Sequence, residues 1–148
     1  MALRAAYWAM HRRADALMAR HGVTADQYVL LSLLAERDGV TQQELVRRAA
    51  SDANTVRAML VRLEEQGLVS RRPHPTDGRA RSVRLTAGGR RAHERLTTAG
   101  ESFRRRLLAA LERGAAAGFA RNLKRVAESM APAPARPRRG SHAVQGVE

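Results

Sequence analysis

The fold is decided by the segment Val69-Ser-Arg-Arg-Pro-His-Pro-Thr-Asp-Gly-Arg-Ala-Arg-Ser-Val-Arg-Leu-Thr86, which is typical of a two-stranded hairpin. The pair Asp77-Gly78 lies at its turn, where glycine supplies the positive φ that a tight hairpin needs. The second arm alternates and places Ser82 and Arg84 on the wet side. The arginines on or beside this hairpin are Arg71, Arg72, Arg79, Arg81 and Arg84. So small a hairpin buries little, so these arginines predict a basic finger that contacts a polyanion.

The composition indicates the same kind of partner. The 148 residues carry 27 Lys+Arg against 14 Asp+Glu, a formal net charge of +13, which favours nucleic acid or an anionic membrane surface. Nearly all cations are arginine, which binds phosphate through paired hydrogen bonds, although GC-rich genomes also give arginine-rich proteins. No apolar stretch approaches the roughly 20 residues of a membrane span, and no signal peptide is evident, so we expect a cytoplasmic protein. Cysteine is absent, which excludes disulfides and thiolate metal sites.

The rest of the chain has the pattern of helices. Apolar residues spaced by three and four predict helices at 2–21, 24–35, 41–49, 51–66, 87–113 and 115–130. Thr24-x-x-Gln27 and Thr41-x-x-Glu44 are capping boxes that begin two of them, and Ser51 or Asp52 caps the fourth. Two short helices joined by a tight turn and followed by a basic hairpin predict a winged helix-turn-helix.

The expected fold is therefore mainly α with a small β-hairpin wing. It comprises an N-terminal dimerisation helix (1–22), a winged helix-turn-helix DNA-binding region (23–86), C-terminal dimerisation helices (87–130) and a disordered basic tail (131–148). The apolar stripes of the first and the last two helices exceed what the small winged region can cover. A homodimer would cover them, and packing of the three helices within one chain is the alternative.

The chain resembles the MarR family of bacterial transcriptional regulators over about residues 3–130. The segment Asp77-Gly-Arg-Ala-Arg-Ser-Val-Arg-Leu-Thr-Ala-Gly-Gly89 is similar to the wing signature of the family, and Leu63-Glu-Glu-Gln-Gly-Leu-Val-Ser-Arg71 is similar to its exit from the recognition helix. The resemblance implies a triangular dimer that binds a palindromic operator and is released by a small, often aromatic or phenolic ligand. Gly78 and Ala58 stand where basic residues are common in the family, which puts those two contacts in doubt.

The expected DNA contacts come from the fourth helix and the wing. They are Asn54, Thr55, Arg57, Arg62, Arg79, Arg81, Asp77 and Ser51, with Gln42 and Gln43 as further phosphate contacts. Asn54 and Thr55 suit hydrogen bonds near a helix N-terminus, and Arg57 suits guanine. By resemblance, Arg79 enters the minor groove and Asp77 orients it. The alternatives are a solvated helix face, capping alone for Ser51 and a plain turn aspartate.

A ligand pocket is expected from Tyr7, Trp8, His11 and Tyr28, with core or interface packing as the alternative. The histidines are scattered, and no metal-ligand cluster or phosphate-binding glycine loop is evident, so we expect neither an enzyme nor a cofactor. A zinc-sensing regulator is a weaker alternative. The expected function is a sequence-specific transcriptional regulator, a dimeric repressor that a small ligand releases from double-stranded DNA. The alternative is a nonspecific architectural DNA-binding protein.

Overall fold

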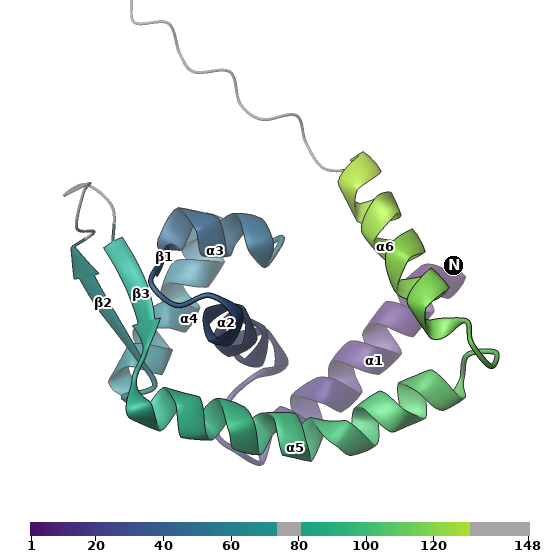
Figure 1. Ribbon diagram of the computed structural model, residues 1–148, viewed down its shortest axis with the longest axis horizontal. Coiled ribbons are helices and arrows are strands. Elements are labelled where there is room, and N and C mark those ends of the chain that lie inside the picture. Colours follow the sequence, from purple (N-terminus) through teal and green to yellow (C-terminus); the bar gives the residue numbers. More distant parts are fainter. Residues whose placement is uncertain (74–80, 131–148) are drawn as a thin grey trace, which may run out of the picture. The chain divides into compact units, whose positions relative to one another are not determined.

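The computed structural model describes residues 1–73 and 81–130 (Figure 1). The elements in chain order are α1 (Ala2–Ala19), α2 (Ala25–Glu36), β1 (Val40–Thr41), α3 (Gln42–Arg48), α4 (Ala53–Glu65), β2 (Val69–Pro73), β3 (Arg81–Leu85), α5 (Ala87–Ala109) and α6 (Ala116–Met130). The chain divides into two compact units, Met1–Leu107 and Leu108–Glu148. The helix predicted at 87–113 ends earlier, at Ala109, ahead of a turn in which Gly114 has a φ of +83°. Among the described helices, none is long and apolar enough to cross a membrane.

The helix starts depend on side-chain caps. The predicted capping box at Thr24 is confirmed: its hydroxyl accepts from the Gln27 N–H (3.1 Å), and the Gln27 side-chain oxygen accepts from the Thr24 N–H (2.9 Å). At Thr41 only half of the predicted box forms, because the hydroxyl accepts from the Glu44 N–H. The Glu44 carboxylate instead binds Arg47 one turn further along, at 2.7 Å, where a charged pair is the stronger interaction.

The hairpin is part of a three-stranded antiparallel sheet with the order β1-β3-β2. The sequence predicted two strands, and β1 was missed because two residues carry no alternation to detect. This third strand explains a second difference. Ser82, expected on the wet side, is only 3% exposed, because it lies between Thr41 of β1 and Arg72 of β2. Within the described residues its hydroxyl oxygen has no hydrogen-bond partner.

One apolar core holds the first unit together. Its wholly buried side chains come from α2, α3, α4, β3 and α5: Leu30, Leu31, Leu34, Leu45, Val56, Leu60, Leu63, Val83 and Leu96. Helix α2 contributes Leu30, Leu31 and Leu34, so it lies at the centre as its dense apolar pattern predicted, although Tyr28 and Leu33 are only partly buried. Helix α4 and the sheet therefore pack against the same apolar core.

The first turn of α5 lies directly against the loop between α4 and β2. The Thr86 N–H donates to the Leu68 carbonyl (3.1 Å) and the Thr86 hydroxyl donates to the Gly67 carbonyl (2.6 Å). A Cβ atom on Gly89 would lie 1.9 Å from the Leu68 carbonyl oxygen. Only glycine fits at position 89, because its missing side chain lets the two backbones meet.

We expect Gly89→Ala to lower the free energy of unfolding by about 3 kcal/mol or more, since the new methyl group must push backbone against backbone. Gly88→Ala is the matched control, because a Cβ there meets its nearest atom at 3.4 Å and alanine favours helix by up to about 1 kcal/mol. Urea unfolding followed by circular dichroism measures both. Equal stability of the two variants would contradict the close approach.

Candidate nucleic-acid interface

Helix α4 is capped at its start and enclosed on its apolar side. The Asp52 carboxylate accepts hydrogen bonds from the N–H groups of Asn54 (3.0 Å) and Thr55 (2.9 Å), so Asp52 is the cap and Ser51 is not. Hydrogen bonds from Thr55, first from its hydroxyl and then from its N–H, hold the pKa of Asp52 below its usual value. The side chains of Val56, Leu60 and Leu63 are wholly buried, which fixes the face that α4 presents to solvent.

A tight turn joins α3 to α4. Ala50 adopts a φ of +49°, in the left-handed region that disfavours any residue with a Cβ atom by about 1–2 kcal/mol. The Ser51 N–H donates to the Val46 carbonyl (3.2 Å) and closes the turn. Ser51 itself is half-buried. The turn sets α4 off from α3 in the helix-turn-helix arrangement.

The structure brings the α4 residues predicted to contact DNA onto one exposed face. Asn54, Thr55, Arg57 and Arg62 are all exposed, opposite the buried leucines. Asn54, Ala58 and Arg62 follow each other at intervals of four and so form one row. Arg57 and Arg62 make no ion pair with any described residue. Gln43 is exposed and Gln42 half-buried at the start of α3.

Two wing arginines lie on the strands that follow α4. Arg72 and Arg81 are exposed, and the register places Arg81 opposite Pro73, where β2 and β3 lead into residues 74–80. In Figure 1, α4 and β2 meet at their lower ends near the start of α5, and both rise from there. Asp77 and Arg79, the other predicted wing contacts, lie outside the described residues.

The expectation that all five wing arginines reach for a polyanion needs a correction at Arg71. Its guanidinium donates to the Glu64 carboxylate through Nε (2.8 Å) and Nη2 (2.5 Å), and its side chain is only 19% exposed. Arg84 remains exposed, but its guanidinium lies over Gly39, where a Cβ would be 3.1 Å from Nη2. Glu64 was missed from the sequence because no local pattern links it to a strand residue seven positions away.

Asp38 is a second residue that sequence reasoning missed. One carboxylate oxygen accepts from the Leu85 N–H (3.0 Å) and the other from Arg90 Nη2 (2.6 Å). The residue thus connects the end of α2 to the end of β3 and the start of α5. Asp38 holds the base of the wing to the core, and its two hydrogen bonds involve no residue on the exposed face of α4.

The four residues predicted for a ligand pocket separate into two groups. Tyr7 and His11 line a hollow of about 280 Å³ together with Asp26 and Phe103, and His11 Nε2 lies 3.6 Å from the Asp26 carboxylate. Trp8 is exposed, with its ring centroid 5.4 Å from that of Tyr7. Tyr28 lies elsewhere: its ring stacks on His93, 5.8 Å away, and its hydroxyl is 3.1 Å from the Thr97 hydroxyl.

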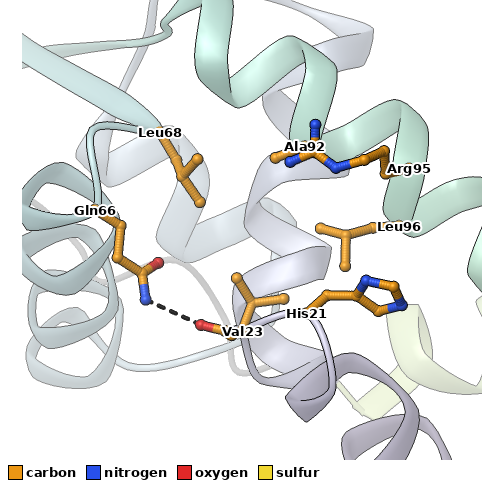
Figure 2. Close-up of a pocket in the computed structure, with 8 residues that line it drawn as sticks. His21, Val23, Gln66, Leu68, Ala92, Arg95 and Leu96 are labelled. Atoms are coloured by element: carbon orange, nitrogen blue, oxygen red, sulfur yellow. Dashed lines mark hydrogen bonds between the residues drawn. The ribbon is translucent and has the colours of Figure 1, made fainter.

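A second hollow, of about 270 Å³, lies where the α1–α2 turn, the end of α4 and α5 meet (Figure 2). The Gln66 side-chain amide donates to the Gly22 carbonyl at 2.9 Å across one side of it. Val23, Leu68, Ala92 and Leu96 form its apolar lining. The sequence did not indicate this hollow. Its hydrogen bond ties the C-terminal end of α4 to the turn before α2.

The fold has counterparts in known proteins. The model of the MarR family matches residues 23–80. The transcriptional regulator HosA of Escherichia coli O111:H- is 40% identical over 67 residues, which are 45% of this chain and 50% of HosA, so the chain spans about half the length of that relative. An HTH-type transcriptional repressor of Mycobacterium bovis is 30% identical over 105 residues, which are 71% of this chain and 76% of the repressor.

Solved structures share the same arrangement. The transcriptional repressor CouR, bound to a 23-mer DNA duplex, superposes with a TM-score of 0.78 at 27% identity, over 85% of this chain and 89% of CouR. The regulator PcaV of Streptomyces coelicolor, in complex with its natural ligand, gives 0.71 at 29% identity, over 80% and 86%.

A helix-turn-helix followed by a small antiparallel sheet with a basic wing defines a winged helix-turn-helix protein. Within that class, the chain belongs to the MarR family. The resemblance seen in the sequence is thereby confirmed.

We expect Asp52→Ala to destabilise the protein at neutral pH, since α4 loses the acceptor of two N–H groups. The folded protein holds the Asp52 pKa low, so the unfolded chain takes up the proton first. The stabilisation is therefore present above about pH 4, the ordinary pKa of aspartate, and is lost as pH falls through the lowered value.

Denaturant unfolding at pH 7 and pH 3 measures this difference. Asp52→Asn keeps an acceptor oxygen and should lose less stability at pH 7 than the alanine variant. A destabilisation by Asp52→Ala that is the same at both pH values would contradict the assignment.

Proposed function

We propose that this chain is a sequence-specific DNA-binding transcriptional regulator that inserts α4 into the major groove of duplex DNA. The observation that carries the proposal is the exposed face of α4, whose opposite face is wholly buried. A helix held in this way presents its polar side chains at fixed positions, which base recognition requires. HosA, a transcriptional regulator, and CouR, a repressor bound to a DNA duplex, support the same role.

Each side chain on this face suits a particular contact. Arg57 can donate two hydrogen bonds to O6 and N7 of guanine, and Asn54 can pair with the edge of adenine. Arg62, Arg72 and Arg81 suit phosphate oxygens, which position the protein on the duplex. Asp77 and Arg79 of the wing belong to the proposal through the family resemblance alone.

The proposal includes a homodimer. On α1, Leu3, Tyr7 and Trp8 are 68%, 52% and 46% exposed. On α6, Phe119, Leu123, Val126 and Met130 form an exposed row at intervals of four, three and four residues. Apolar rows of this length favour a second subunit, and a two-fold dimer would present two α4 helices to successive major grooves, about 34 Å apart. A palindromic operator follows from that symmetry.

The proposal also includes repression relieved by a small ligand. The hollow beside Tyr7 and His11 lies between α1, α2 and α5, so an occupant would contact helices of both the dimerisation and the DNA-binding regions. An aromatic or phenolic molecule suits its mixture of aromatic, imidazole and carboxylate groups. The ligand-bound structure of PcaV supports ligand control in a relative. Ligand binding would favour a separation of the two α4 helices that no longer matches the operator.

A nonspecific architectural DNA-binding protein is the alternative, and the net charge of +13 favours it as well. For such a protein only charge matters, so the identity of Arg57 would be immaterial. The two functions differ in the ratio of affinities for a preferred duplex and a random one.

We expect Arg57→Ala to weaken binding to a preferred duplex by about 10- to 100-fold, the effect of one lost bidentate base contact. The preferred duplex is selected from a random-sequence pool by the wild-type protein, and a scrambled duplex of equal composition serves for comparison. Arg91→Ala is the matched control, because Arg91 is exposed on α5 and carries the same charge. Fluorescence anisotropy at constant salt measures all affinities. Equal losses for both variants on both duplexes would favour the architectural alternative.

We expect sodium salicylate to change the emission of Trp8, the only tryptophan, because a ligand beside Tyr7 lies close to its ring. His11→Ala should abolish the response, whereas Tyr28→Phe should retain it, since Tyr28 does not line the hollow. The same ligand should weaken binding to the selected duplex. Unchanged emission at millimolar salicylate, or equal responses of the two variants, would count against this pocket.

A further inference from the structure

The junction between α4 and the wing is a short joint. The chain leaves α4 at Gln66, turns at Gly67 with a φ of +69°, and enters β2 at Val69. A Cβ on Gly67 would meet nothing within 4 Å, so the turn is held through its backbone, whose Gly67 carbonyl accepts a hydrogen bond from the Thr86 hydroxyl. Backbone bonds from Gly67 to Glu64 (2.9 Å) and from Leu68 to Leu63 (2.9 Å) close the helix end. The outer part of β2 lies beyond these bonds, where it pairs with β3.

One pair of side chains bridges this joint. Glu64 in the last turn of α4 accepts three hydrogen bonds from Arg71 in the middle of β2: from its N–H (3.1 Å), Nε (2.8 Å) and Nη2 (2.5 Å). These bonds lower the pKa of Glu64, the side-chain bonds from Arg71 being the largest cause. A forked, charge-assisted contact of this kind fixes orientation as well as distance.

The pair is not needed to bury the core. Val56, Leu60 and Leu63 already hold α4, while Val69, Val83 and Leu85 hold the base of the sheet. The Glu64 side chain is 37% exposed and lies between the buried residues of α4 and those at the base of the sheet. A carboxylate beside a surface that binds a polyanion weakens that binding through repulsion. Glu64 therefore has an electrostatic cost for DNA binding that some other role must offset.

We propose that the Glu64–Arg71 pair is a positioning pair that sets the angle between α4 and the wing and so determines sequence specificity without touching DNA. The inference rests on the proposed DNA-binding function. Asn54 lies ten residues before Glu64, about 15 Å along the helix. A change of about 10° at the joint shifts the wing against Asn54 by about 2–3 Å over that length, enough to separate a base contact from its partner.

Contacts to phosphate tolerate such a shift, because arginine side chains are long and phosphates recur along the duplex. Loss of the pair therefore affects preferred and random DNA differently. A preferred sequence loses its base contacts, while a random sequence binds as well as before or more tightly, since one negative charge has gone. A purely structural defect lowers the active fraction of protein and leaves the ratio of the two affinities unchanged.

The test compares Glu64→Gln with Glu65→Gln, its exposed neighbour on α4, which loses the same charge. Affinities are measured for the duplex selected by the wild-type protein and for its scrambled counterpart. We expect Glu65→Gln to change both affinities by the same factor. Glu64→Gln should reduce the ratio of selected to scrambled affinity by about tenfold, the effect of one lost base contact. An identical ratio for the two variants overturns the inference and leaves the proposed function standing.

Arg71→Lys provides a second readout, because lysine keeps the positive charge but cannot make the fork. The ratio of selected to scrambled affinity should fall for Arg71→Lys, as it does for Glu64→Gln. Thermal unfolding checks that both variants fold. A wild-type ratio for Arg71→Lys overturns the inference. If the wild-type protein itself selects no sequence from the pool, the proposed function fails first, and this outcome is distinguishable from the other two.

Discussion

The close approach of α5 to the loop after α4 is the constraint on which the rest of the structure depends. The carbonyl oxygens of Gly67 and Leu68 accept hydrogen bonds from Thr86, and Gly89 lets the first turn of α5 lie against the Leu68 backbone. Three parts of the protein meet there: the end of α4, the first strand of the wing and the helix that continues toward the C-terminus. A displacement of this loop would move all three, so the loop must be fixed before any of them can be positioned.

Charge is distributed in two ways over this framework. Within the described ranges, three carboxylates pair with arginines of another element: Asp38 with Arg90, Glu36 with Arg48 and Glu64 with Arg71. The arginines on the exposed face of α4 have no such partner among the described residues. Because the chain holds 27 cationic residues against 14 acidic ones, the acidic residues are too few to neutralise both groups. Arg57 and Arg62 on the exposed face of α4 belong to the excess, so this face carries positive charge that would favour a polyanion.

The sequence predicted what short-range rules control. The helices, the cap at Thr24 and the solvated face of α4 follow from spacing within one or two turns, and each lies close to the predicted range in the structure. The sequence did not predict β1, whose two residues show no alternation. It also did not predict the burial of Ser82, which depends on that strand. The arginines of the wing look alike in the sequence. Which of them is engaged inside the protein depends on Glu64, and only the folded chain brings the two together.

The predicted ligand pocket shows the same limit more sharply. Four aromatic or imidazole residues suggested one site, but α2 turns Tyr28 toward His93 and away from the hollow that Tyr7 and His11 share. Helical position decides this, and the relevant neighbours, Asp26 and Phe103, lie on other helices. Composition can suggest candidate residues for such a site, but packing determines which of them line it.

The turn at Ala50 has a consequence of its own. An alanine held at a positive φ stores a little conformational energy that opening of the turn releases. Local opening should therefore begin here, between two otherwise well-capped helices, and the amide protons of residues 50–52 should exchange with deuterated solvent sooner than those of the α4 interior. The helix-turn-helix thus contains a point where opening is favoured, next to a helix that is capped at its start and buried on one face.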